Sequence, residues 1–191
     1  MKNFKLLITY LFTNLTGETN YNSLKNLLNF KSATTVKNYL EFMRESYLVF
    51  ELFKYDYSLK KQYVSNKKMF VIDNGVRNAV AFSFSKDTGK LLENLVFIEL
   101  KRRAEDIFYY KGKKECDFLV RKGLKITEAI QVSLSLGNPE TEQREIAGLL
   151  EAMEKFKLKK GLIITESQED ERKIKGQKIE IVPAWKWLLK K

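Results

Sequence analysis

The sequence contains no histidine and a single cysteine, Cys116. Without histidine the chain cannot build a Cys/His zinc site, a Ser-His-Asp triad or a Cys-His catalytic pair, because each of these sites uses an imidazole. One cysteine cannot form an intramolecular disulfide. Several large classes of enzyme, and the disulfide-stabilised scaffolds, are therefore excluded.

Long apolar runs are also missing. No segment approaches the roughly 20 apolar residues of a membrane-spanning helix. The opening MKNFKLLITYLFTNLTG has too short and too interrupted an apolar run for a signal peptide. We therefore expect a cytoplasmic protein with no membrane insertion.

A nucleotide-binding loop is absent as well. The pattern G-x-x-x-x-G-K-[ST], whose backbone amides hold nucleotide phosphates, does not occur in the chain. Its nearest match, DTGKLL, lacks both the first glycine and the hydroxyl residue after the lysine. We therefore expect no ATP site and no ATPase activity in this chain.

Acidic residues are scarce relative to basic ones. The chain has 35 Lys and Arg against 24 Asp and Glu, and residues 1–90 alone hold 14 basic and 7 acidic residues. A positive excess attracts phosphate backbones, although a need for solubility would give the same count. With 44% apolar and 31% charged residues, the chain has the balance of a globular protein. The composition favours DNA as a partner of the first part of the chain.

Residues 21–45 have the pattern of two short helices. Apolar residues recur at helical spacing within 21–30 and again within 32–45, where Ser32 is placed to cap the second helix. The apolar face of that second helix leaves a polar face, and we expect its members to contact nucleic acid: Thr34, Thr35, Lys37 and Asn38. This pairing predicts a helix-turn-helix.

The next segment, YLVFELFKYDYSLKKQYV, is rich in aromatic and β-branched residues and predicts two strands joined by a hairpin tip at 55–61. A helix-turn-helix followed by a hairpin makes a winged helix. In such a module the second helix enters the major groove, and hairpin lysines contact phosphates, here Lys54, Lys60 and Lys61. Winged helices also dock proteins, so that alternative stays open.

The element order changes after residue 86. We predict a helix over 87–103, strands over 105–111, 114–122 and 124–133, a helix over 139–156, and a strand, a further strand and a short helix after 158. The acidic run 166–171 is predicted to be a loop. The fold class is therefore α/β in its second part and α+β overall, with domains at 1–86 and 87–191.

The strand pattern predicts a polar site. Gln131 and Ser133 are two residues apart and share one face of their strand, whereas Glu128 points to the other. Asp117 on the neighbouring strand is expected on the face of Gln131. A site that binds Mg²⁺ needs at least one or two converging carboxylates, with a positive group to stabilise the reacting phosphate, and Asp117 is the one residue here that is certain to be of the right type.

This arrangement, with an acid on the preceding helix, resembles the PD-(D/E)XK nuclease superfamily. That motif has an acidic residue on the first helix, Asp on the second strand and Glu-x-Lys on the third. Here Glu93 stands on the helix, Asp117 lies in ECDFLV, and AIQVS forms the third strand. The resemblance implies a winged helix-turn-helix followed by a restriction-endonuclease-like mixed sheet flanked by helices.

Most of the chain is also similar to the C-terminal region of a prokaryotic, chiefly archaeal, AAA+ ATPase family. The likeness lies in SATTVKNYLEFMRESYLVFEL, FVIDNGVRNAV, GKLLENLVFIELKRR, YYKGKKECDFLV, KKGLIIT and VPAWKWLL. Because the nucleotide loop is missing, three interpretations stay open: a stand-alone relic, one piece of a split gene, or a fragment. A separately encoded ATPase half is the partner that the resemblance implies.

Residue by residue, the resemblance makes Glu93 the helix acid, Asp117 the strand acid, Gln131 the third-strand acid and Ser133 the lysine. The last two depart from the motif: Gln removes a negative charge, and Ser removes the cation beside the phosphate. Asp117 and Glu93 would then hold Mg²⁺ or Mn²⁺.

Arg144, on the next helix, would hold the scissile phosphate, although it cannot act as a general base. Three functions follow as alternatives. We predict a nucleic-acid-binding module with a degenerate nuclease site; the alternatives are an active metal-dependent DNA endonuclease and a protein-docking module.

Overall fold

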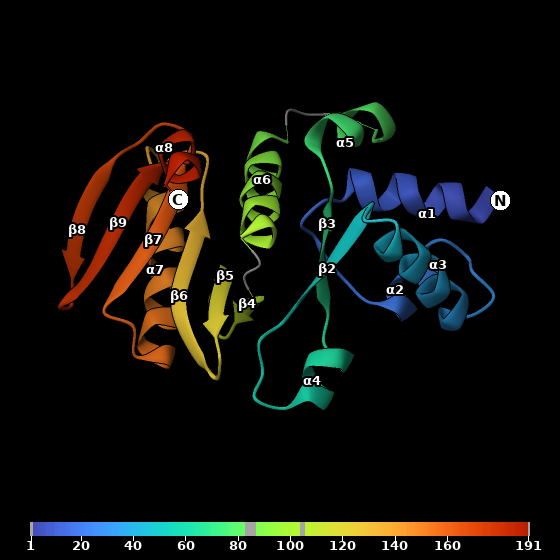
Figure 1. Ribbon diagram of the computed structural model, residues 1–191, viewed down its shortest axis with the longest axis horizontal. Helices are drawn as coiled ribbons and strands as arrows, with labels where there is room; N and C mark the ends of the chain where they lie inside the picture. The colour runs from blue at the N-terminus through green and yellow to red at the C-terminus, as the bar shows by residue number, and fades with distance from the viewer. Residues whose placement is uncertain (1, 83–86, 104–105, 191) are drawn as a thin grey trace. The chain divides into compact units, whose positions relative to one another are not determined.

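The computed structural model describes residues 2–82, 87–103 and 106–190. The chain divides into two compact units, Met1–Ile98 and Glu99–Lys191. Over the described residues it forms eight helices, a three-stranded sheet and a six-stranded sheet (Figure 1). The predicted mixed α and β fold is confirmed. None of the helices in the described ranges combines the length and the apolarity needed to span a bilayer.

Three helices begin the first unit: α1 (Lys2–Thr13), α2 (Tyr21–Leu27) and α3 (Ala33–Glu45). The predicted cap at Ser32 is confirmed, because its hydroxyl oxygen accepts a hydrogen bond from the Thr35 N–H at 3.1 Å and so satisfies an amide at the helix start. Asn20 caps α2 in the same way. The apolar faces of these helices meet in one buried core, whose members include Leu7, Leu11, Leu24, Val36, Leu40 and Met43.

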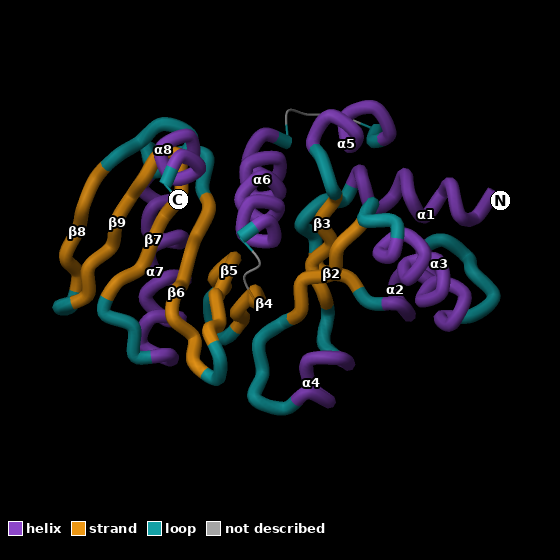
Figure 2. Tube along the Cα trace, viewed as in Figure 1, coloured by secondary structure: helices purple, strands orange, loops and turns teal. Residues whose placement is uncertain are grey.

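A small sheet follows, with the strand order β1 (Glu18–Thr19), β3 (Lys67–Val71) and β2 (Val49–Phe53). The strands β2 and β3 pair antiparallel and form a hairpin. It is not the hairpin that was predicted, because residues 62–64, expected to start the second strand, belong to a helix, α4 (Leu59–Val64), and the strand that pairs with β2 comes later in the chain (Figure 2). Gln62 is the buried residue of α4, and its side chain donates to the Asp56 carbonyl oxygen, which fixes the helix against the loop before it.

Two further helices complete this unit, α5 (Asn74–Val80) and the first part of α6 (Thr88–Arg102). Asn94 on α6 accepts from the Val71 N–H and donates to the Val71 carbonyl oxygen, so its amide extends the hydrogen bonding of β3. Phe97 stacks on Phe70 with ring centroids 4.0 Å apart. The start of α6 thus packs against β3.

The domain assignment 1–86 and 87–191 stays a prediction. Residues 83–86, just before its boundary, lie outside the described residues, as do 104 and 105, where the first strand of the second part was expected to begin. The boundary between the two compact units falls later, inside α6.

The second unit is built on the six-stranded sheet, in the order β4-β5-β6-β7-β9-β8. Its strands are β4 (Asp106–Lys111), β5 (Glu115–Lys122), β6 (Lys125–Val132), β7 (Lys160–Thr165), β8 (Asp170–Ile174) and β9 (Gln177–Pro183). The pairs β6/β7 and β7/β9 are parallel and the others antiparallel, which makes the sheet mixed as predicted. The acidic run is not entirely a loop, because Asp170 and Glu171 begin the edge strand β8.

The helix α7 (Pro139–Phe156) packs against β5, β6 and β7, and the short α8 (Ala184–Leu189) closes the chain (Figure 1). A close approach sets the position of α7: Gly148 lies against the backbone of Glu115, so near that a Cβ atom there would stand 2.0 Å from the Glu115 carbonyl oxygen. Glycine is needed here for space rather than for its conformational freedom.

We expect Gly148→Ala to destabilise the protein, because the added methyl group must push α7 away from β5. Overpacking of this kind costs about 2 kcal/mol, measured as the free energy of unfolding in urea. Gly89→Ala in α6 is the matched control, since nothing lies within 4 Å of a Cβ at that position and alanine favours helix. Equal stability of the two variants would contradict the close packing of α7.

Candidate functional site

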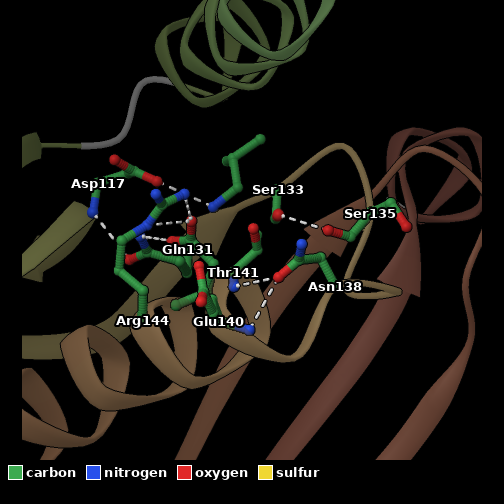
Figure 3. Close-up of polar contacts among 10 residues, drawn as sticks. Asp117, Gln131, Ser133, Ser135, Asn138, Glu140, Thr141 and Arg144 are labelled. Carbon is green, nitrogen blue, oxygen red and sulfur yellow. Dashed lines mark hydrogen bonds and ion pairs between the residues drawn. The ribbon is translucent and has the colours of Figure 1, made fainter.

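The strands β5 and β6 part at Asp117 and Gln131. The last backbone pair between them is Phe118 with Ile130, and beyond it side chains replace backbone partners. The Asp117 N–H donates to Gln131 Oε1 at 3.3 Å, and the Val132 N–H donates to Asp117 Oδ2 at 3.0 Å (Figure 3). On the other side of β5, the register with β4 shifts opposite Asp117, and bulges of this kind commonly re-aim a side chain beside a site.

A buried carboxylate from α7 completes the group. Gln131 Nε2 donates to Glu145 Oε2 at 2.5 Å, and the guanidinium of Arg144 donates to Glu145 Oε1 through Nη2 at 2.7 Å and Nε at 3.1 Å. Asn138 accepts from two amides of the first turn of α7 and so fixes where this helix starts (Figure 3). We call Asp117, Gln131, Arg144 and Glu145 the Asp117–Glu145 network.

Two carboxylates, one guanidinium and one neutral amide make up this network. Its carboxylates are buried, with Asp117 8% and Glu145 6% exposed. The hydrogen bond and charge of Glu145, and to a smaller extent the charge of Asp117, raise the pKa of Arg144. Arg144 therefore stays charged and offsets part of the negative charge of the two acids.

The predicted shared face is confirmed for Asp117 and Gln131, and Glu128 lies on the exposed side of β6, where it pairs with Lys122. Ser133 follows β6 and is buried. Its hydroxyl donates to the Ser135 carbonyl oxygen at 3.2 Å and turns toward Ser135 in Figure 3. No described hydrogen bond joins Ser133 to the network.

Glu93 has a partner within the first unit. Its carboxylate lies 3.0 Å from Lys68 Nζ, and both side chains are largely buried. Because Glu93 and Asp117 belong to different units, the expected approach of these two acids stays a prediction.

The donor set does not fit a divalent cation as it stands. Gln131 Oε1 and Asp117 Oδ2 each accept a backbone amide, and Gln131 turns its NH₂ group to Glu145. Among the residues that the structure describes, no group of three or more His, Cys, Asp or Glu is placed to hold a metal ion. A cation would have to replace these hydrogen bonds with its own.

The residues expected to contact nucleic acid lie in the first unit. Thr34, Lys37 and Asn38 are exposed on α3, whereas Thr35 is engaged with the capping Ser32. At the hairpin, Lys54 is half-buried, and Lys60 and Lys61 are exposed on α4. A groove of about 390 Å³ lies between α3, β2 and α4. Lys37 and Arg44 of α3 and Tyr63 of α4 are among the residues that line it. We call it the α3–α4 groove.

Comparison with known proteins places the chain in a family. Residues 88–187 match the family described as "Domain of unknown function (DUF4143)". The chain belongs to the DUF4143 family. Residues 1–87 match a second description, "Domain of unknown function (DUF8612)". The Asp117–Glu145 network thus lies in the DUF4143 part, and the α3–α4 groove in the DUF8612 part.

Two longer relatives are similar over nearly the whole chain. "Uncharacterized protein MJ1544" of Methanocaldococcus jannaschii is 40% identical over 99% of this chain. An "Uncharacterized protein" of Haemophilus influenzae is 30% identical over 97%. The chain spans only 45% of the length of each relative. No solved structure matches it.

Sequence reasoning missed Glu145, although the DUF4143 helix α7 carried a signal for it. Glu145 stands on the same helical face as the buried Leu149 and Ala152, four and seven residues further on. A buried acid on an apolar face needs hydrogen-bond partners, and the buried Gln131 and the exposed Arg144 supply them here.

We expect Gln131→Glu to turn the Asp117–Glu145 network into a cation site. The third carboxylate would repel Glu145 and raise the pKa of one of these two acids. The free energy of unfolding of the variant would therefore fall as pH rises, and its loss relative to the wild-type protein would be larger at pH 8 than at pH 5. Binding of Mn²⁺ should restore about 2.7 kcal/mol at a concentration about 100-fold above Kd. Thermal unfolding with and without Mn²⁺ measures this.

Gln143→Glu is the matched control, because it adds the same charge at an exposed position of α7. Mn²⁺ should leave the control and the wild-type protein unchanged. Equal stabilisation of the wild-type protein by Mn²⁺ would contradict the prediction that the glutamine keeps a cation out of the network.

Proposed function

We propose that this chain is a nucleic-acid-binding module, and that its DUF4143 part keeps a nuclease-like fold with a degenerate site. The observation that carries the proposal is the double engagement of the Gln131 amide, which accepts from the Asp117 N–H and donates to Glu145. An amide that bridges two strands and a helix in this way acts as a structural link between them.

Two chemical requirements of metal-dependent phosphodiester cleavage count against activity. The reaction needs carboxylates that converge on a metal and a cation that stabilises the charged phosphorus intermediate. Gln131 stands at the position of one acid, and Ser133 at the position of the lysine. Arg144 is the cation of the network, and its guanidinium is already paired with the Glu145 carboxylate.

Binding is proposed for the first unit, with α2, α3 and the β2/β3 hairpin as a winged helix. The pairing of α2 with α3, followed by an antiparallel hairpin, supports this assignment. Lys37 is exposed on α3, and Lys60 and Lys61 are exposed on the hairpin tip, so cations stand on both elements that contact DNA in winged helices.

The relation to AAA+ ATPases belongs to the same proposal. The order of the sequence motifs supports it. The two relatives are more than twice as long as this chain, so their additional length is sufficient for a further domain. We propose that DNA and a separately encoded ATPase half are the partners of the chain.

A metal-dependent DNA endonuclease is the second candidate, and Glu145 is the observation that favours it. This acid reaches the network from α7 and adds a second buried carboxylate beside Asp117. Cleavage would require the Gln131 side chain to release Glu145, so that Asp117, Glu145 and Gln131 Oε1 could hold Mg²⁺ or Mn²⁺ together.

We expect the protein to bind duplex DNA with an affinity that falls steeply as salt rises. Each phosphate contact contributes about −0.9 to the slope of log K against log salt, so Lys37→Ala, Lys60→Ala and Lys61→Ala should each reduce that slope by about one. Fluorescence anisotropy across a salt series measures it. Lys125→Ala, an exposed lysine at the β5–β6 turn, is the control. Loss of affinity in the control alone would overturn the assignment to the first unit.

We also expect no cleavage of single-stranded, duplex or branched DNA with Mg²⁺ or Mn²⁺. A gel that displays retarded but uncut DNA for both the wild-type protein and Asp117→Asn agrees with the degenerate site. Metal-dependent cutting that EDTA stops and that Asp117→Asn abolishes would establish the endonuclease instead.

A further inference from the structure

The lining of the α3–α4 groove includes aromatic rings and a guanidinium, beside Lys37, Leu40 and two carboxylates. Tyr63 lies on α4 and is 67% exposed, and its ring makes an edge contact with Phe53 of β2 at a centroid distance of 5.5 Å. This contact limits the freedom of the Tyr63 ring, while the high exposure leaves much of the ring open. An aromatic ring held in place and open to solvent loses little entropy when a second ring stacks on it.

The guanidinium comes from Arg44 at the end of α3. Its Nη1 donates to Glu51 Oε2 at 2.8 Å, and the Tyr21 hydroxyl donates to the other oxygen of the same carboxylate at 2.8 Å. Glu51 is buried, whereas the Arg44 side chain is 45% exposed. The buried carboxylate therefore orients a guanidinium whose remaining surface faces the groove.

One further cation lines the groove, and other exposed cations and a ring lie on or just before α4. Lys37 lines it, and Lys60 and Lys61 are exposed on α4, the helix that carries Tyr63. Tyr57, which precedes α4, is 76% exposed and makes an edge contact with Tyr55 at 5.4 Å. Exposed rings together with lysines are the combination that binds a single nucleic-acid strand, because rings stack on bases and lysines follow the phosphates.

We propose that the α3–α4 groove receives an unpaired base of a single-stranded nucleic acid, stacked on Tyr63 and on the Arg44 guanidinium, with Lys37, Lys60 and Lys61 along the backbone. A paired base is ruled out as the occupant, because its faces are covered by its neighbours in the duplex, whereas an unpaired base exposes both faces to a ring and a guanidinium. Glu41, the acid on the rim of the groove, can accept from an exocyclic amino group of the base. This inference rests on the proposed nucleic-acid binding.

The experiment uses the full chain and a single-stranded oligonucleotide that carries one 2-aminopurine, a base whose fluorescence falls when it stacks. Anisotropy gives the affinity, and a duplex of the same length is measured in parallel. The variant is Tyr63→Leu, which keeps apolar bulk against Phe53 but has no ring, and Tyr63→Phe tests the ring without the hydroxyl. Phe42→Ala is the matched control, since Phe42 is an exposed aromatic residue of α3 outside the groove.

We expect fluorescence quenching with the wild-type protein and with Tyr63→Phe. Tyr63→Leu should lose the quenching and weaken single-strand binding about tenfold, as removal of one stacking ring typically does, while duplex binding changes by less than about twofold. Phe42→Ala should behave as the wild-type protein does in both assays.

Salt-sensitive duplex binding together with unchanged single-strand binding by Tyr63→Leu would overturn this inference and leave the proposed function standing. Absence of salt-sensitive binding to either nucleic acid would overturn the proposed function, and the inference with it. Far-UV circular dichroism of Tyr63→Leu and Tyr63→Phe checks that both variants are folded before the affinities are compared.

Discussion

The Gln131 side chain holds together the place where β5 and β6 part. At this point each strand leaves backbone groups without a ladder partner, and a buried amide or carbonyl without a partner costs free energy. The Gln131 carbonyl oxygen and the Asp117 carboxylate take over two of those amides, and the Gln131 NH₂ group ties the strands to Glu145 on α7. This one amide therefore links the divergence of the strands to α7, whose position also depends on the close approach of Gly148 and on the Asn138 cap.

The same amide accounts for the difference between this network and a metal site. A carboxylate at this position could not donate to Glu145, so the two acids would repel each other unless a cation or a proton lay between them. An amide removes the need for either. The network is thus satisfied by groups of the protein itself, and Arg144 supplies a positive charge at its edge.

The first unit also holds a buried carboxylate, Glu51, that orients a partly exposed guanidinium, Arg44. In this respect it resembles the network, where the buried Glu145 holds the exposed Arg144. The difference lies in the surroundings, because Arg44 lines a groove together with Lys37 and the exposed ring of Tyr63. This groove is the physical reason for proposing that the first unit binds nucleic acid and that the network has a structural role.

The sequence by itself determined most elements of the second part, the Ser32 cap and the shared face of Asp117 and Gln131, because these depend on short-range periodicity and local hydrogen bonds. It also determined that two positions depart from the nuclease motif, since residue type alone shows this. Only the tertiary structure decided that Glu145 joins the network, that Glu93 pairs with Lys68, and that residues 59–64 form a helix at the hairpin tip. The edge strand β8 was decided in the same way, by pairing with β9. The Glu145 and Glu93 contacts join residues 14 and 25 positions apart, which short-range periodicity cannot reveal. The α4 helix and β8 depend on nearer contacts, with the Asp56 carbonyl oxygen and with β9, that override local propensity.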